Sequence, residues 1–274
     1  MEGITEPCLA ILGHPIAGNP SQLAIERALK SIGKDWRVSS FDVAPKDFDK
    51  AMAGLDVLGF HGVWLDSTLS NARNLADPSK GGDSKPQAYD MWSRDDDGEL
   101  SPISLRQGWL SNQLEKTPKP KSPNSGNSAI ETSEAGTLKA ESISAVLFGE
   151  LDSSKTLDCE LDAWMKAIES LDIPITQSLE VSDLLEANLV ILPPGGKPID
   201  AEDLDLAKSA SSPKQPLLMN FSAHEIDPLK SFRLYVGSSH QMLAEVLANA
   251  VEVWTKDRPD ESMLFDAIEE YFAV

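Results

Sequence analysis

Positive charge is scarce in this sequence. Only 24 lysine and arginine residues stand against 44 aspartate and glutamate residues, which gives a formal net charge of −20. Such a chain lacks the cationic surface that nucleic acid phosphates and anionic lipid headgroups require, so we expect neither nucleic acid nor a membrane as a partner. The acidic residues are best interpreted as a solvated surface that keeps the protein soluble.

Cysteine and long apolar runs are scarce as well. We interpret Cys8 and Cys159, the two cysteines of the chain, as reduced packing residues rather than as a disulfide or a metal pair. No apolar run approaches the roughly 20 residues that span a bilayer. The acidic N-terminal segment also lacks the basic start of a signal peptide. These absences favour a cytoplasmic protein without a bound metal.

The first 65 residues alternate between strand and helix patterns. Cys8 to Leu12 is a short apolar run closed by Gly13, which predicts a buried strand. Asn19 followed by Pro20 is typical of a helix start, and the helical pattern then continues to Gly33. Two further strands and one short helix, stopped by Gly54, are expected at 36–43, 60–65 and 47–53. The alternation predicts an α/β fold with a mostly parallel sheet.

The rest of the chain divides at a polar segment. Residues 91–100 read as a hairpin strand with its turn at 95–98, and the polar, Gly/Ser-rich stretch before them, 77–85, reads as a loop. Residues 116–139 hold almost no large apolar side chain, so we expect a linker there. A second α/β series follows, with strands at 144–148, 173–176, 189–192 and 217–221 and helices at 158–171, 241–254 and 261–272.

Two motifs at the N-terminus resemble the shikimate dehydrogenase family. They are Leu9-Ala-Ile-Leu-Gly-His-Pro-Ile-Ala17 and Gly59-Phe-His-Gly-Val-Trp-Leu65, and Val251-Glu-Val-Trp-Thr255 resembles the family's C-terminal helix. The resemblance implies a two-domain α/β protein: a substrate-type domain, a linker and a doubly wound Rossmann-like domain. The expected boundaries are 1–115 with the returning helices of 240–274, then 116–139, then 140–239.

The resemblance also assigns positions in a substrate cleft between the domains. Asn19 and Ser21 fall where the family has a Ser-x-Ser pair that binds the substrate carboxylate, although helix-start roles explain both residues as well. Asp66 falls on a threonine that holds a substrate hydroxyl. Ser70 falls on the catalytic lysine, and a serine has no ammonium group with which to donate a proton or stabilise an alkoxide.

The remaining cleft positions are apolar in this sequence. Met91 aligns with a substrate-binding asparagine of an Ala-Val-Asn-Thr motif, and Leu105 with the aspartate partner of the lysine in Asn-Thr-Asp-Gly. Val246 aligns with a substrate-binding glutamine. A shifted alignment could place Lys80, Lys85 or Asp90 at one of these family positions. Restoring every one of the positions would need several independent shifts of the alignment. No catalytic residue is therefore expected.

The cofactor loop departs from the family in its own way. A dinucleotide site needs spaced glycines that let the backbone approach the pyrophosphate. Here the strand is followed by Gly149-Glu-Leu-Asp-Ser-Ser154, in which Gly149 is the single glycine and Glu150 and Asp152 carry negative charge. A carboxylate about 4 Å from a phosphate costs about 4 kcal/mol at an effective dielectric constant of 20. We therefore expect no cofactor, with NADP as the alternative.

Two hypotheses follow for the function. In the first, the chain is a shikimate dehydrogenase-like protein without hydride transfer, a pseudoenzyme or binding scaffold that holds a small molecule in its cleft and forms a homodimer or remains a monomer. In the second, it is an active NADP-dependent dehydrogenase acting on shikimate or quinate with altered site residues. The first is favoured because the substrate, catalytic and cofactor positions all differ from the family.

Overall fold

The computed structural model describes residues 6–69, 89–115, 143–149, 159–195, 216–222, 234–236 and 238–273. The chain forms two compact units, of which the first comprises 1–108, 154–170 and 237–274, and the second 109–153 and 171–236. These bounds differ from the expected domain boundaries at several places. Residues 109–115, which we expected in the substrate-type domain, belong to the second unit. The helix at 159–170, which we expected in the Rossmann-like domain, belongs to the first unit.

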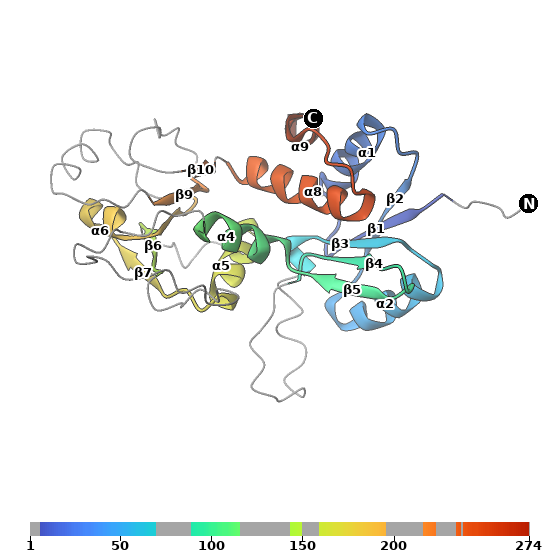
Figure 1. The fold of residues 1–274 in the computed structure, drawn as a ribbon, viewed down its shortest axis with the longest axis horizontal. Coiled ribbons are helices and arrows are strands. Elements are labelled where there is room, and N and C mark those ends of the chain that lie inside the picture. The colour runs from blue at the N-terminus through green and yellow to red at the C-terminus, as the bar shows by residue number, and fades with distance from the viewer. Residues whose placement is uncertain are drawn as a thin grey trace, which may run out of the picture. The chain divides into compact units, whose positions relative to one another are not determined.

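The first unit is built on a five-stranded mixed sheet (Figure 1). Its strand order is β2-β1-β3-β4-β5. β1 pairs in parallel with both β2 and β3, whereas β3-β4 and β4-β5 are antiparallel. The expected hairpin is confirmed, with Gly98 donating its backbone N–H to the Asp95 carbonyl oxygen at 3.1 Å. The strands are β1 (Cys8–Gly13), β2 (Arg37–Asp42), β3 (Gly62–Leu65), β4 (Met91–Arg94) and β5 (Leu100–Ile103).

Helices cover both faces of this sheet because its central strands β1 and β3 are apolar on both faces. Leu12, Val63 and Leu65 pack with Phe48 and Leu55 of α2 in one core cluster. On the other face α8 contacts β4, and α1, α8 and α9 pack on one another. The helices of this unit are α1 (Ser21–Ser31), η1 (Pro45–Asp47), α2 (Phe48–Val57), α5 (Cys159–Ser170), α8 (Ser239–Thr255) and α9 (Glu261–Ala273).

The expected stop of α2 at Gly54 is wrong. The helix continues to Val57 and is followed by Gly59, which has a φ of +73°. A glycine inside a helix costs only about 1 kcal/mol relative to alanine, so it does not end a helix whose apolar face is buried. Gly59 instead takes the left-handed conformation that terminates helices at little cost to glycine.

The second unit contains a five-stranded sheet in the order β10-β9-β8-β6-β7, and every pairing in it is parallel. Val146, Val190 and Leu218 from three neighbouring strands form its core with Leu184 of α6. This is the doubly wound type of sheet expected from the sequence. Its elements are β6 (Ala145–Phe148), β7 (Ile175–Ser178), α6 (Val181–Glu186), β8 (Leu189–Leu192), β9 (Leu217–Asn220) and β10 (Leu234–Val236).

Three elements were not expected from the sequence: α4 (Leu105–Glu115), α6 and β10. Leu105–Gly108 of α4 belong to the first unit and its remaining residues to the second. In the part of the chain that the structure describes, no helix is both long enough and apolar enough to cross a bilayer.

Candidate functional site

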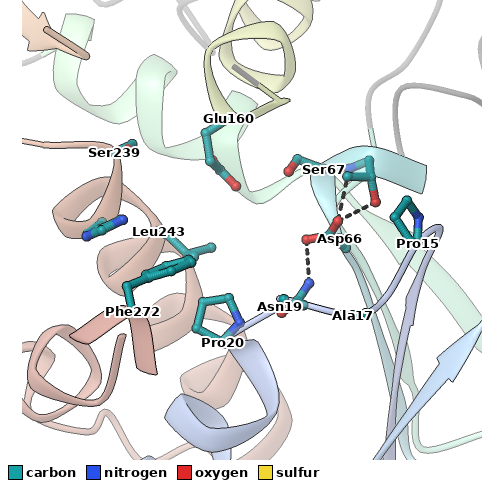
Figure 2. A pocket seen from close by; sticks show the side chains of 13 residues that line it. Pro15, Ala17, Asn19, Pro20, Asp66, Ser67, Glu160, Ser239, Leu243 and Phe272 are labelled. Carbon is teal, nitrogen blue, oxygen red and sulfur yellow. Dashed lines mark hydrogen bonds between the residues drawn. The ribbon is translucent and has the colours of Figure 1, made fainter. Parts of the chain in front are cut away.

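A pocket of about 260 Å³ lies in the first unit, beside the carboxyl ends of β1 and β3 (Figure 2). The chain leaves β1 for β2 on one side and later returns to β3 on the other, so loops diverge at this point of the sheet. Such a switch point leaves a crevice where ligands of open α/β sheets bind. The thirteen described residues that line it are Pro15, Ala17, Gly18, Asn19, Pro20, Asp66, Ser67, Thr68, Glu160, Ser239, His240, Leu243 and Phe272.

Asp66 is held by donors from two loops. Its Oδ1 accepts a hydrogen bond from Asn19 Nδ2 at 2.5 Å, and its Oδ2 accepts one from the Thr68 backbone N–H at 3.1 Å and another from the Thr68 hydroxyl. The Asp66 backbone N–H donates to the Leu12 carbonyl oxygen, which fixes the carboxylate beside the end of β1. All three donors to the carboxylate are neutral, so the negative charge of Asp66 has no cation beside it among these partners.

Asn19 connects this carboxylate to the start of α1. Its Oδ1 accepts a hydrogen bond from the Ser21 backbone N–H at 2.7 Å. The helix begins at Ser21, one residue later than the sequence predicted, so Pro20 rather than Asn19 is its N-cap residue. The side chain of Asn19 therefore links the start of α1, through its oxygen, to Asp66, through its amide.

Glu160, at the start of α5, supplies a second carboxylate to the pocket. Both of its oxygens accept hydrogen bonds from Arg106 Nη2, at 2.8 and 2.7 Å. In Figure 2 the Glu160 and Asp66 side chains come from different elements, and both point into the pocket.

Arg106 is fully buried beneath this wall, between two carboxylates and two indole rings. Its Nη1 donates to Asp90, and its backbone N–H donates to the other oxygen of the same carboxylate at 2.9 Å. The guanidinium carbon lies 5.9 Å from the ring centre of Trp64 and 5.7 Å from that of Trp164. Burial by itself lowers the pKa of Arg106, but the charges of Glu160 and Asp90 and hydrogen bonds to both raise it above the ordinary value. Arg106 therefore stays charged.

The third wall comes from the C-terminal helices. The rings of His240 and Phe272 are stacked, with centres 4.8 Å apart and planes 7° from parallel. His240 Nδ1 lies 2.5 Å from Glu269 Oε1, which fixes the orientation of the imidazole. The hydroxyl of Ser238 caps α8 by accepting from the Gln241 backbone N–H, and thereby positions the first turn of that helix at the pocket.

The structure brings together only part of the set predicted from the resemblance. Asn19 and Asp66 line the pocket. Ser21 is 1% exposed, and its hydroxyl has no hydrogen-bond partner among the described residues. Met91 and Val246 are completely buried in the core, and Leu105 is buried at the first position of α4. Ser70, Lys80, Lys85, Glu150 and Asp152 lie outside the described residues.

Arg106 and Glu160 are among the residues of the site that the sequence argument missed, together with His240, Leu243 and Phe272 of the C-terminal helices. Arg106 lies one position after Leu105, and Asp90 one position before Met91. If the Ala-Val-Asn-Thr motif is aligned one residue earlier, Asp90 falls on its asparagine. If the Asn-Thr-Asp-Gly motif is aligned one residue later, Arg106 falls on its aspartate. The feature of the sequence that could have revealed this pair is the opposite charge of Asp90 and Arg106 on the two sides of the β4–β5 hairpin. The two side chains form an ion pair in the structure.

Polar groups at the ends of β6 and β7 bond to one another. The Gly149 backbone N–H donates to the Ser178 carbonyl oxygen at 3.0 Å, and the Gly149 carbonyl accepts from Gln177 Nε2 at 2.8 Å, so both groups are used within the sheet. At the end of β7 the Ser178 hydroxyl donates to Asp183 at 2.6 Å and accepts from the Glu180 backbone N–H. No group of three or more potential metal ligands occurs among the described residues.

Comparisons with known proteins show which fold this chain shares. No family model matches the chain. A shikimate dehydrogenase (NADP(+)) of Geobacter metallireducens is 43% identical over 54 residues, which is 20% of this chain and 19% of that protein. The match thus spans about a fifth of the length of the curated relative.

Solved structures match over nearly the whole chain. Shikimate 5-dehydrogenase from Thermus thermophilus, in complex with NADP(H) and shikimate, is 17% identical with a TM-score of 0.54, covering 97% of this chain and 99% of its own. A 5-ketofructose reductase of Gluconobacter sp. strain CHM43 is 12% identical with a TM-score of 0.57, covering 98% and 99%. Quinate dehydrogenase of Corynebacterium glutamicum in complex with NAD is 13% identical with a TM-score of 0.54, covering 97% and 99%. This protein therefore has the two-domain α/β fold of the shikimate dehydrogenases.

Proposed function

We propose that this protein is a small-molecule binding protein on the shikimate dehydrogenase fold and that it does not carry out hydride transfer. The observation that carries the proposal is the charge of the pocket. Among the described lining residues the permanently charged side chains are the carboxylates of Asp66 and Glu160, and no lysine or arginine lines it. A pocket of this charge disfavours a substrate that carries a carboxylate, such as shikimate or quinate.

The carboxylates of the pocket also lack a neighbouring lysine or arginine among the described lining residues. Glu160 accepts two bonds from Arg106, and Asp66 accepts bonds from Asn19 and Thr68. These bonds orient both carboxylates, but no cation lines the described pocket to stabilise the alkoxide that forms when a substrate hydroxyl loses its proton. The acidic sequence after Gly149, with Glu150 and Asp152, also argues against an NADP site.

The direct test is an absorbance assay for reduced cofactor with the purified protein, using shikimate and quinate, each with NADP and with NAD. We expect no rate above the rate without protein, while an authentic shikimate dehydrogenase serves as the positive control. Turnover of either substrate at an ordinary enzymatic rate contradicts the proposal.

A further inference from the structure

We propose that two copies of this chain dimerise through strand β2, whose outer edge pairs antiparallel with the β2 edge of the second copy. β2 is the strand at one end of the sheet of the first unit (Figure 1). The pairing joins the two sheets into one continuous sheet around a two-fold axis. The inference concerns assembly, so it goes beyond the proposed function and does not rest on it.

The first step of the argument is the outer edge of β2. Among the described strands, β2 pairs with β1 alone. The Arg37 backbone N–H donates to the Pro7 carbonyl oxygen at 3.2 Å, so the backbone groups of Arg37 face β1. Because these groups alternate in direction along a strand, those of Val38, Ser40 and Asp42 face away from β1. No described backbone group bonds to them there, so they can pair with another strand.

The second step is the contrast with β5, the strand at the other end of the same sheet. Pro102 lies inside β5, and a proline has no N–H to offer to a further strand. β2 contains neither proline nor lysine. Gln22 Nε2 donates to the Val38 carbonyl oxygen at the long distance of 3.4 Å, and a carbonyl oxygen can accept a second bond. β2 is therefore the edge of this sheet at which a strand can be added.

The third step is the fit of β2 to an antiparallel copy of itself. With the two-fold axis at Ser40, the side chain of Ser39 lies opposite Phe41 of the second copy, on the same face of the sheet. Phe41 is 38% exposed and is held by Phe60, with ring centres 6.2 Å apart. The two Phe41 rings are then diagonal neighbours across the axis. Arg37 is diagonal to Phe41 of the second copy as well, within reach of a cation–π contact.

Charges on the other face of the sheet are complementary too. Lys30 of α1 lines a cavity together with Val38, and the side chains of Lys30 and Arg37 have no partner among the described residues. In the proposed pairing Val38 lies opposite Asp42 of the second copy, which brings that carboxylate beside Lys30. Asp42 bonds His14 through Oδ1 at 2.7 Å, so its Oδ2 can accept from Lys30.

The cavity that holds Lys30 is not itself acidic, although the chain as a whole is. Its lining combines three acidic with three basic side chains, whereas the whole chain has a formal charge of −20. Two copies of so acidic a protein repel each other over most of their surfaces. The β2 edge is a place where this repulsion is weak, and the two-fold axis creates the Lys30–Asp42 pair twice.

The experiment is sedimentation velocity of the full-length protein over a range of micromolar concentrations. We expect a dimer that dissociates on dilution. Ser39→Lys places two ammonium groups close to the axis and should raise the dimer dissociation constant at least about tenfold. Ser101→Lys is the matched control, because it makes the same change at an exposed serine of the β5 edge, and it should leave the constant unchanged. A monomer at every concentration, or an equal effect of the two variants, overturns the proposal.

A charge exchange tests the pairing itself. Lys30→Glu and Asp42→Lys each place like charges across the axis, so each variant alone should dimerise about three- to tenfold more weakly. In an equal mixture of the two variants, a heterodimer has two attractive pairs, Glu with Lys and Lys with Asp. We expect the mixture to regain the affinity of the unmodified protein. A mixture that dimerises no better than the separate variants contradicts this interface, whatever the outcome of the cofactor assay.

Discussion

Gly62 on β3 lies directly against the indole ring of Trp254 at the end of α8. A Cβ atom added to Gly62 would be 2.1 Å from Trp254 Nε1. The same nitrogen donates a hydrogen bond to the Trp92 carbonyl oxygen at 3.1 Å, and the ring is buried. The glycine therefore allows the last turn of α8 to be tied to the central strands of the sheet.

The first prediction concerns this contact. Gly62→Ala should destabilise the protein by about 1–3 kcal/mol, because the ring must move and strain its hydrogen bond. The measurement is urea unfolding followed by tryptophan fluorescence. Gly54→Ala is the matched control: Gly54 is inside α2 with no atom within 4 Å of an added Cβ, so the substitution should stabilise by up to about 1 kcal/mol. A neutral Gly62→Ala variant would contradict the packing described.

The second prediction concerns the buried charges. Arg106→Met should cost about 3–5 kcal/mol, because it leaves Asp90 and Glu160 buried without their cation. Adding Asp90→Asn and Glu160→Gln to Arg106→Met should recover much of the loss, since uncharged amides replace the unpaired carboxylates. Denaturant unfolding of the single and triple variants measures both the loss of unfolding free energy and its recovery. A triple variant no more stable than Arg106→Met would show that the loss comes from the packing of the arginine on Trp64 and Trp164 rather than from unpaired charge.

The third prediction concerns the cofactor. Millimolar NADP should not raise the melting temperature, because ligand that binds the native state must stabilise it and the acids near β7 oppose the phosphate. The comparison is with NAD and with a buffer of matched ionic strength. Glu180→Gln combined with Asp183→Asn removes these acids. A clear rise of the melting temperature of the unmodified protein with NADP would contradict our assignment of the nucleotide side.

The fourth prediction concerns pH. Hydrogen bonds from the backbone N–H and hydroxyl of Ser262 lower the pKa of Asp260, which precedes α9. A carboxyl group whose pKa is lower in the folded state stabilises the fold above its unfolded pKa, about 3.9 for aspartate, and loses this effect as the pH falls through the folded value. Asp260→Asn should therefore be less stable than the unmodified protein near neutral pH. The difference should shrink as the pH falls below about 4, which unfolding curves at several pH values can measure.

The buried central strands of both sheets could be predicted from the sequence because such strands are short, continuous apolar runs. Residues 8–12 and 189–192 are such runs, and each forms a strand in the structure. Residues 105–115 have no clear apolar face at helical spacing, so the helix there was not predicted. The short helix α6 and strand β10 carry too few residues for a periodic pattern to emerge.

The pocket could be predicted only where its residues follow a strand directly. Asn19 and Asp66 follow β1 and β3, so the topology of the sheet brings them together. Glu160 is 54 residues from Arg106 in the chain, and no local pattern connects them. Residues whose partners come from a distant segment need the tertiary structure to be found. The bond between Arg106 and Asp90 is closer in sequence, and it was missed because the motif alignment was placed one residue away.

The composition of the first unit from three separate stretches, 1–108, 154–170 and 237–274, has a consequence for synthesis on the ribosome. Its central strands leave the exit tunnel early, but α8 and α9, which cover one face of them, are translated much later. The bond between Trp254 and Trp92 spans 162 residues, so it closes only after all of these residues have been synthesised. The apolar face of the nascent sheet is exposed for that whole interval, when an incompletely folded chain is prone to aggregate. Deletion of residues 237–274 should therefore yield aggregated nascent chains rather than a stable fragment.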